Sequence, residues 1–169
     1  KTGTVKAAAK KPAKKAAKKT AKKAAKKPAA KKSAKKAAKN ELPHGAGELI
    51  LIVDDEENIR NAAEATLVRF GYRAVTAVDG TDALAVYSQY KGDIKVVLTD
   101  LAMPYMDGNA LVRALRKLDP QIKVIAMSGL ISEEKIVELK GLGVNEFLPK
   151  PYSAEALLKS IVNVMSPPE

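Results

Sequence analysis

The chain has 169 residues, enough for one domain with a sizeable core and an additional segment, and its net charge is +11 at pH 7. It contains no cysteine, which excludes disulfides and thiolate metal sites, and no apolar run of the ~20 residues that a membrane span requires. Because the first residues also lack the apolar segment of a secretory signal, we expect a soluble protein of the cytoplasm without a membrane partner.

Charge divides the chain into two parts. Residues 1–40 hold 17 of the 30 basic residues, all of them lysine, and no acid; the other 13 basic and all 19 acidic residues give the rest of the chain a net charge of −6. No apolar side chain in this tail is larger than valine, so we expect the tail to be disordered. Residues 41–47, with one proline and two glycines, are predicted to be a linker, and His44 within it a spacer residue.

The tail repeats lysine doublets in an alanine-rich background, a composition that resembles the tails of linker histones and of bacterial histone-like proteins. The resemblance implies non-specific DNA binding, driven by the release of counterions from phosphates, and would make the protein nucleoid-associated. The candidate phosphate contacts are Lys10, Lys11, Lys14, Lys15, Lys18, Lys19, Lys22, Lys23, Lys26 and Lys27. The alternative is a solvated spacer that binds nothing in particular.

From residue 48 onward, five apolar runs alternate with five amphipathic segments. The runs, predicted to be strands, are Leu49–Val53, Ala74–Val78, Ile94–Thr99, Lys123–Met127 and Val144–Leu148. The predicted helices lie at about 57–69, 80–90, 108–118, 133–141 and 153–165. Gly71 and Gly141 are predicted to end helices, and Ser132 and Ser153 to begin them.

Strict alternation of strands and helices with short connections predicts an α/β domain at residues 48–169. Its core would be a doubly wound, five-stranded parallel sheet with helices on both faces and right-handed crossovers. By analogy with flavodoxin-like folds we expect the strand order 2-1-3-4-5.

Acidic residues follow two of the predicted strands directly. Asp54 and Asp55 end the first strand, and Asp100 ends the third. In the order 2-1-3-4-5 these strands are neighbours, so three carboxylates converge at the carboxyl edge of the sheet. Their mutual repulsion favours a bound cation, and an all-oxygen ligand set suits Mg²⁺ or Mn²⁺. Taken singly, each aspartate is more typical of a helix cap or a turn than of a functional site.

Two more polar side chains follow the fourth and fifth strands at the same edge. Ser128 supplies a hydroxyl, and Lys150, next to Pro151, supplies an ammonium group. Carboxylates, a metal ion, a hydroxyl and an ammonium group together describe a pocket for a phosphoryl group. Asp100 would be the attacking carboxylate and would form an aspartyl phosphate.

These motifs are Asp54-Asp55, Asp-x-x-Met-Pro-x-Met-Asp-Gly at 100–108, Ser128 and Lys150-Pro151. Together they resemble the receiver domain of two-component response regulators. The resemblance spans residues 48–165 and implies that Asp100 accepts phosphate from a sensor histidine kinase, a phosphotransfer protein or a small acyl phosphate. It further implies that Mg²⁺ is bound by Asp55, Asp100 and the backbone carbonyl of Ala102, and by Asp54 through water.

The resemblance also assigns roles around the phosphoryl group. Ser128 and Lys150 would bind its oxygens, and Ser128 with Phe147 would form a switch. The Lys150–Pro151 peptide bond would be cis, and phosphorylation would favour a dimer through the 4-5-5 face, formed by the fourth helix, fifth strand and fifth helix. Such a domain is a phosphoacceptor that assists its own phosphorylation and dephosphorylation, not an enzyme acting on a separate substrate.

Three other interpretations stay open at this point. The chain could be the C-terminal receiver of a hybrid histidine kinase with the tail as spacer, since residues 41–48 resemble the lead-in to such receivers. It could be a mainly architectural DNA-binding protein, which leaves the acidic edge unexplained. An aspartate-nucleophile phosphohydrolase of the haloacid dehalogenase type would need a second acid two residues after Asp100, where this chain has Ala102.

Overall fold

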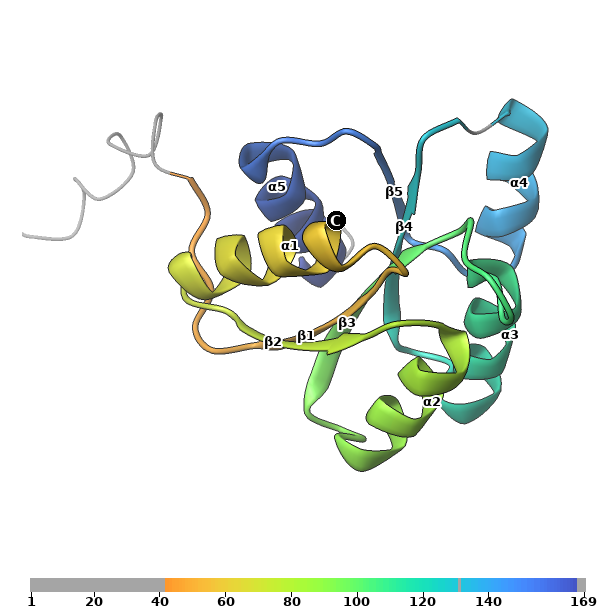
Figure 1. The fold of residues 1–169 in the computed structure, drawn as a ribbon, viewed down its shortest axis with the longest axis horizontal. Helices are drawn as coiled ribbons and strands as arrows, with labels where there is room; N and C mark the ends of the chain where they lie inside the picture. The colour runs from red at the N-terminus through yellow and green to blue at the C-terminus, as the bar shows by residue number, and fades with distance from the viewer. Residues whose placement is uncertain (1–41, 131, 167–169) are drawn as a thin grey trace, which may run out of the picture. The chain divides into compact units, whose positions relative to one another are not determined.

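The computed structural model describes residues 42–130 and 132–166, so the lysine-rich tail lies outside the described part of the chain. The strands are β1 Leu49–Val53, β2 Arg73–Ala77, β3 Ile94–Asp100, β4 Lys123–Ser128 and β5 Glu146–Pro149. The helices are α1 Glu57–Arg69, α2 Gly80–Gln89, α3 Gly108–Leu118, α4 Glu133–Gly141 and α5 Ala154–Met165. The predicted alternation is confirmed (Figure 1).

All five strands are parallel and lie in the order β2-β1-β3-β4-β5, which confirms the predicted doubly wound sheet. Helices α1 and α5 cover one face, and α2, α3 and α4 cover the other (Figure 1). Because successive side chains of a strand point to opposite faces, Leu51 packs into the α2–α3–α4 core and Ile52 into the α1–α5 core. None of the described helices has the length and apolar character needed to span a membrane.

Four strands begin or end one or two residues away from the expected positions, and β3 and β4 each end one residue later than predicted. The second was predicted to end at Val78, but β2 ends at Ala77 because the Val78 N–H donates to the Asp82 carboxylate at 3.1 Å instead of a strand partner. The fifth was predicted to begin at Val144, but β5 begins at Glu146. The end of β2 is therefore set by a side-chain contact that an apolar pattern does not encode.

The helix ends follow the predicted residues. Ser132 and Ser153 accept N–H groups from the first turns of α4 and α5, and Gly71 has a left-handed φ of +84° after α1, as expected. Gly141 is the last residue of α4, as predicted. The left-handed conformation after this helix is taken by Gly143, with a φ of +94°.

The segment predicted to be a linker packs along the domain. The N–H of Gly45 donates to the Phe70 carbonyl at 2.8 Å, and the N–H of Gly47 donates to the Gly71 carbonyl at 2.9 Å. The His44 ring, predicted to be a spacer, lies 5.1 Å from the Phe70 ring between centroids. The connection to the tail is therefore held against the end of α1.

One arginine joins three segments at the amino edge of the sheet. The guanidinium of Arg116, near the end of α3, donates to the carbonyls of Pro120 (2.8 Å), Ile122 (2.5 Å) and Gly143, and to Oδ1 of Asn145 (3.1 Å). These acceptors belong to the α3–β4 and α4–β5 connections. Arg116 therefore ties both connections to α3.

Replacing Arg116 by methionine should lower the free energy of unfolding by about 2–3 kcal/mol, because several partly buried carbonyls lose their donor. Urea unfolding followed by circular dichroism measures the change. Arg113→Met is the matched control: it lies one turn earlier on α3, and its 3.6 Å ion pair with Glu138 is largely exposed, so about 0–0.5 kcal/mol is expected. Equal losses in the two variants would contradict the assignment.

Candidate functional site

Three aspartates meet at the carboxyl edge of the sheet. Asp54 and Asp55 directly follow β1, Asp100 ends β3, and one carboxylate oxygen of each lies within 4.8 Å of the others. Asp54 and Asp100 are buried, whereas Asp55 is exposed. This is the convergence that the strand order predicts.

A lysine that follows the edge strand β5 neutralises part of this negative charge. Nζ of Lys150, which follows β5, donates to Oδ2 of Asp54 and to Oδ2 of Asp100, at 2.6 Å each. Burial favours the neutral amine, but the hydrogen bonds to Asp100 and Asp54 outweigh it, so the pKa of Lys150 is raised. Lys150 is therefore cationic at neutral pH. The Lys150–Pro151 peptide bond is cis.

The two buried aspartates also accept backbone hydrogen bonds from the turns that follow them. Oδ1 of Asp54 accepts the N–H of Glu56 at 2.9 Å, and Oδ1 of Asp100 accepts the N–H of Ala102 at 3.1 Å. Each carboxylate thus uses one oxygen locally and presents the other to Lys150. The turn role and the site role coexist in the same side chains.

A glycine at the start of α3 packs against the backbone of Asp100. The N–H of Gly108, the first residue of α3, donates to the Leu101 carbonyl at 3.3 Å. A Cβ at Gly108 would collide with the backbone oxygen of Asp100 and the Cα of Leu101, neither of which can turn aside. Because α3 passes this close to the end of β3, only glycine fits here.

Ser128 and Phe147 line the same cavity. The Ser128 hydroxyl donates to the Leu130 carbonyl at 3.1 Å, and among the described residues it makes no hydrogen bond with the three carboxylates. Both side chains line an apolar cavity of about 240 Å³ between β4, β5 and α4; the other lining residues are Ala126, Ile136, Leu148 and Pro149. The structure therefore brings the two predicted switch residues together, next to unfilled space.

The loop after β3 contains a strained tyrosine. Tyr105 has a left-handed φ of +65° and a side chain that is 97% exposed, so nothing in its packing offsets the backbone strain. Tyr105→Asn should raise the free energy of unfolding by about 0.5–1 kcal/mol, measured by urea unfolding. Leu130→Asn is the control, since Leu130 is equally exposed without a left-handed φ, and no change is expected. A destabilised Tyr105→Asn would overturn this reading.

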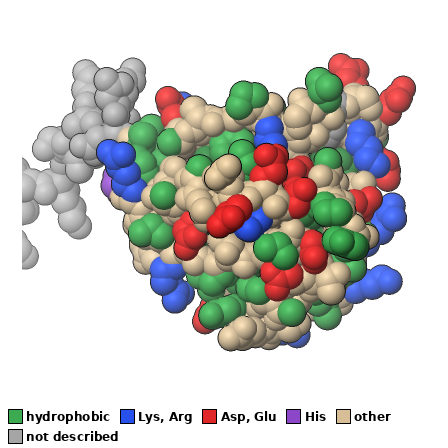
Figure 2. Space-filling model, viewed as in Figure 1, with side chains coloured by type: hydrophobic (Ala, Val, Ile, Leu, Met, Phe, Trp, Pro, Cys, Tyr) green, Lys and Arg blue, Asp and Glu red, His purple; other side chains and the backbone are tan. Residues whose placement is uncertain are grey.

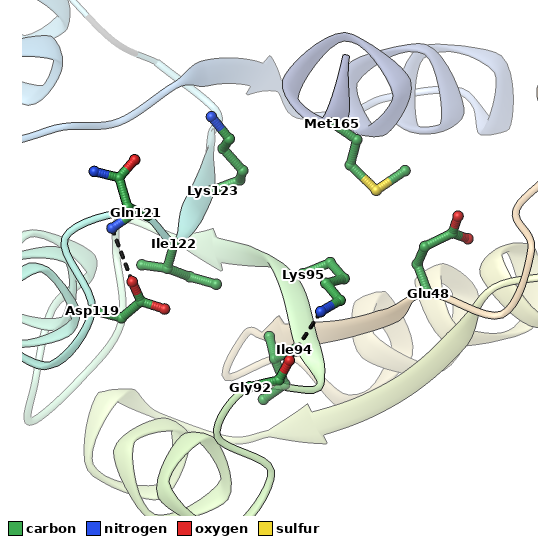
Figure 3. A pocket seen from close by; sticks show the side chains of 9 residues that line it. All are labelled: Glu48, Gly92, Ile94, Lys95, Asp119, Gln121, Ile122, Lys123 and Met165. Carbon is green, nitrogen blue, oxygen red and sulfur yellow. Dashed lines mark hydrogen bonds between the residues drawn. The ribbon is translucent and has the colours of Figure 1, made fainter. Parts of the chain in front are cut away.

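A larger hollow of about 510 Å³ lies at the opposite, amino edge of the sheet (Figure 3). Its lining residues are Glu48, Gly92, Ile94, Lys95, Asp119, Gln121, Ile122, Lys123 and Met165. Two acids balance two lysines, and the dashed bonds in Figure 3 show that Asp119 accepts from Gln121 and that Lys95 donates to Gly92. The three carboxylates within 4.8 Å of one another lie at the carboxyl edge instead, and Figure 2 shows acidic side chains gathered near the middle of one face of the domain. We place the functional site at the carboxyl edge.

Residues 50–162 match the family model of the response regulator receiver domain. The chain belongs to this family. The receiver domain is 32% identical over 124 residues to the chemotaxis protein CheY of Treponema pallidum, covering 73% of this chain and 86% of that protein. It is 34% identical over 116 residues to the sensor kinase CckA of Brucella abortus, covering 69% of this chain but only 12% of the kinase.

Solved structures agree with this family. CheY4 of Vibrio cholerae superposes on the receiver domain with a TM-score of 0.68 and 34% identity, covering 71% of this chain and all of that one. The CheY of Borrelia burgdorferi, solved in a complex with CheX, BeF₃ and Mg²⁺, gives a TM-score of 0.68 at 27% identity, covering 70% and 90%. These similarities confirm the expected receiver fold.

Not every predicted residue can be placed, and one residue near the site was not predicted. The candidate lysines of the tail, Lys10 to Lys27, lie outside the described residues. Sequence reasoning also missed Arg60, whose Nη1 donates to the backbone oxygen of Asp54 at 2.6 Å. The sequence feature that could have pointed to Arg60 is a basic residue near the start of α1, where the helix dipole favours acidic residues.

Proposed function

We propose that this receiver domain takes a phosphoryl group on Asp100 from a phosphohistidine of a sensor kinase or phosphotransfer protein. The observation that carries the proposal is the position of Lys150, with its ammonium between the carboxylates of Asp54 and Asp100 and with Asp55 close by. A carboxylate whose oxygen already faces a fixed cation suits a reaction that brings more negative charge to that oxygen.

The three carboxylates fit a divalent cation, since their oxygens lie close together and Lys150 balances only one charge. Asp55, Asp100 and the Ala102 carbonyl would hold Mg²⁺ or Mn²⁺, with Asp54 acting through water. When bound, the ion would supply positive charge to the carboxylates and to the phosphoryl oxygens.

The chain's own residues would carry the transfer. A carboxylate oxygen of Asp100 attacks the phosphorus, the P–N bond breaks, and its electron pair leaves with the imidazole of the donor. Lys150 shifts its hydrogen bond from Asp100 to a phosphoryl oxygen, and the Ser128 hydroxyl donates to another. The domain is then a phosphoacceptor that assists its own phosphorylation and, with water, its own dephosphorylation.

The test is direct detection of the product. The full chain is incubated with acetyl phosphate and Mg²⁺, and its intact mass and peptide map are recorded. We expect the added mass of one phosphoryl group on the peptide containing Asp100, and none in the presence of EDTA. No adduct, or an adduct on another residue, would disprove the assignment.

Metal removal gives a separate prediction. Mg²⁺ at about ten times its dissociation constant should raise the free energy of unfolding by about 1.4 kcal/mol, because only the folded state assembles the carboxylates. Asp55→Asn should abolish this increase. Glu57→Gln, which neutralises an exposed acid nearby, should keep it. Thermal unfolding with Mg²⁺ and with EDTA measures the difference, and an unchanged Mg²⁺ effect in Asp55→Asn would count against the site.

We also propose a switch that links phosphorylation to the 4-5-5 face of α4, β5 and α5. The Ser128 hydroxyl would turn from the Leu130 carbonyl to the phosphoryl group, and the Phe147 ring would enter the adjoining cavity. The altered surface would favour a dimer. Ring resonances of Phe147 that stay unchanged on adding Mg²⁺ and beryllium fluoride would argue against this movement.

The charge pattern supports a second function, non-specific DNA binding by the tail, with 17 lysines and no acid in residues 1–40. DNA affinity of the full chain is compared with that of residues 41–169 at two salt concentrations, with and without beryllium fluoride and Mg²⁺. Binding by the full chain alone, weakened steeply by salt, is expected. Binding by neither would make the tail a spacer and leave a relay module, as in a hybrid kinase.

A further inference from the structure

Arg60 is the second cation next to the acidic edge. It is the fourth residue of α1, and its Nη1 donates to the backbone oxygen of Asp54 at 2.6 Å. Lys150 binds the side chain of the same aspartate. Asp54 is therefore held by two positive groups, through its carboxylate and through its main chain.

The surroundings of Arg60 are acidic, yet it is not neutralised by an ion pair. Asp55, Glu56 and Glu57 are exposed and lie at the start of α1. Among the described residues, none of the ion pairs involves Arg60, and its one side-chain hydrogen bond uses one of five N–H donors. A cation near a helix N-terminus also opposes the helix dipole. Its charge is therefore available to an anionic partner other than these acids.

We propose that Arg60 is a positioning residue that draws the anionic phosphate donor toward Asp100. The inference rests on the proposed function at Asp100 and adds Arg60 to the residues of the motifs given above. Its guanidinium is half-buried, so its field is only partly screened, and its effect on the donor comes from its charge.

The positive charge of Arg60 should also weaken the binding of Mg²⁺ at the site. Mg²⁺ held by Asp55 and Asp100 is a cation, so a fixed guanidinium near Asp54 weakens its binding. Removal of the charge should therefore have opposite effects on the two ligands: tighter Mg²⁺ and slower capture of the phosphate donor. A residue that merely supported the turn between β1 and α1 would weaken both.

The experiment uses the full chain with Arg60→Met, Arg60→Gln as a second neutral variant, and Arg60→Lys. Mg²⁺ affinity is measured by calorimetric titration, and the initial rate of adduct formation with acetyl phosphate is measured by mass at saturating Mg²⁺. We expect about threefold tighter Mg²⁺ and an about fivefold lower rate in both neutral variants. Arg60→Lys should stay within about twofold of wild type in both, because it keeps the charge.

Arg69→Met is the control, since Arg69 ends the same helix and lies over Phe70. It should change neither quantity. Weaker Mg²⁺ together with a lower rate, or an unchanged rate, in the neutral variants would overturn the inference about Arg60 alone. A wild-type chain that binds Mg²⁺ but forms no adduct would overturn the proposed function instead, and the two failures are therefore distinguishable.

Discussion

Asp100→Asn should abolish the phosphoryl adduct while leaving the fold intact. The amide has no carboxylate oxygen that can attack phosphorus, and Asp54, the other carboxylate that Lys150 binds, is fully buried. Loss of one like charge from the cluster of three carboxylates should leave the free energy of unfolding unchanged or slightly higher. The adduct is measured by mass after incubation with acetyl phosphate and Mg²⁺.

The matched control for Asp100 is Asp93→Asn. Asp93 is an exposed acid before the start of β3, at the opposite edge of the sheet. It should retain full adduct formation. An Asp100→Asn protein that still gains one phosphoryl group under the same conditions would place the acceptor elsewhere.

Gly108→Ala should have the largest effect on stability. The added Cβ would overlap the backbone oxygen of Asp100 and the Cα of Leu101, so α3 must move away from the end of β3. We expect the free energy of unfolding to fall by about 3 kcal/mol, because two backbone segments cannot relax as a flexible side chain can. Since Asp100 moves with the strand end, the rate of adduct formation should fall as well.

Gly129→Ala provides the comparison for Gly108. Gly129 lies in the loop after β4, has no left-handed φ, and a Cβ there would meet nothing within 4 Å. A change within about 0.5 kcal/mol is expected. Urea unfolding of both variants tests whether the loss of stability comes from the close backbone contact at Gly108 or from replacing any glycine. Equal destabilisation of the two variants would contradict the role of the close contact.

Much of the fold was predictable because buried positions of strands and helices appear in the sequence as runs or periodic patterns of apolar residues. Every residue of β1 is buried, so its apolar run has sharp limits and its predicted bounds agree with the structure. At the end of α4 the sequence has two glycines within three residues; Gly141 ends the helix as predicted, but only Gly143 takes the left-handed conformation. The choice depends on contacts with Arg116, which donates to the Gly143 carbonyl from another helix.

The location of the candidate site was also predictable. Asp54, Asp55 and Asp100 end neighbouring strands, so topology alone brings their carboxylates to one edge. The direction of the Ser128 hydroxyl toward Leu130, and the contact of Arg60 with the Asp54 main chain, were not predictable. Each depends on a single rotamer or carbonyl direction, for which sequence spacing carries no signal.

The sequence by itself determined the alternation of strands and helices, the acidic residues at the strand ends and the division of charge between tail and domain, because periodicity and composition are local properties. Only the tertiary structure decided which atoms meet. Lys150 and Asp54 are 96 residues apart, and their 2.6 Å contact exists because β1, β3, β4 and β5 pair in one parallel sheet. A contact over that separation is set by the packing of the whole sheet and by no local pattern.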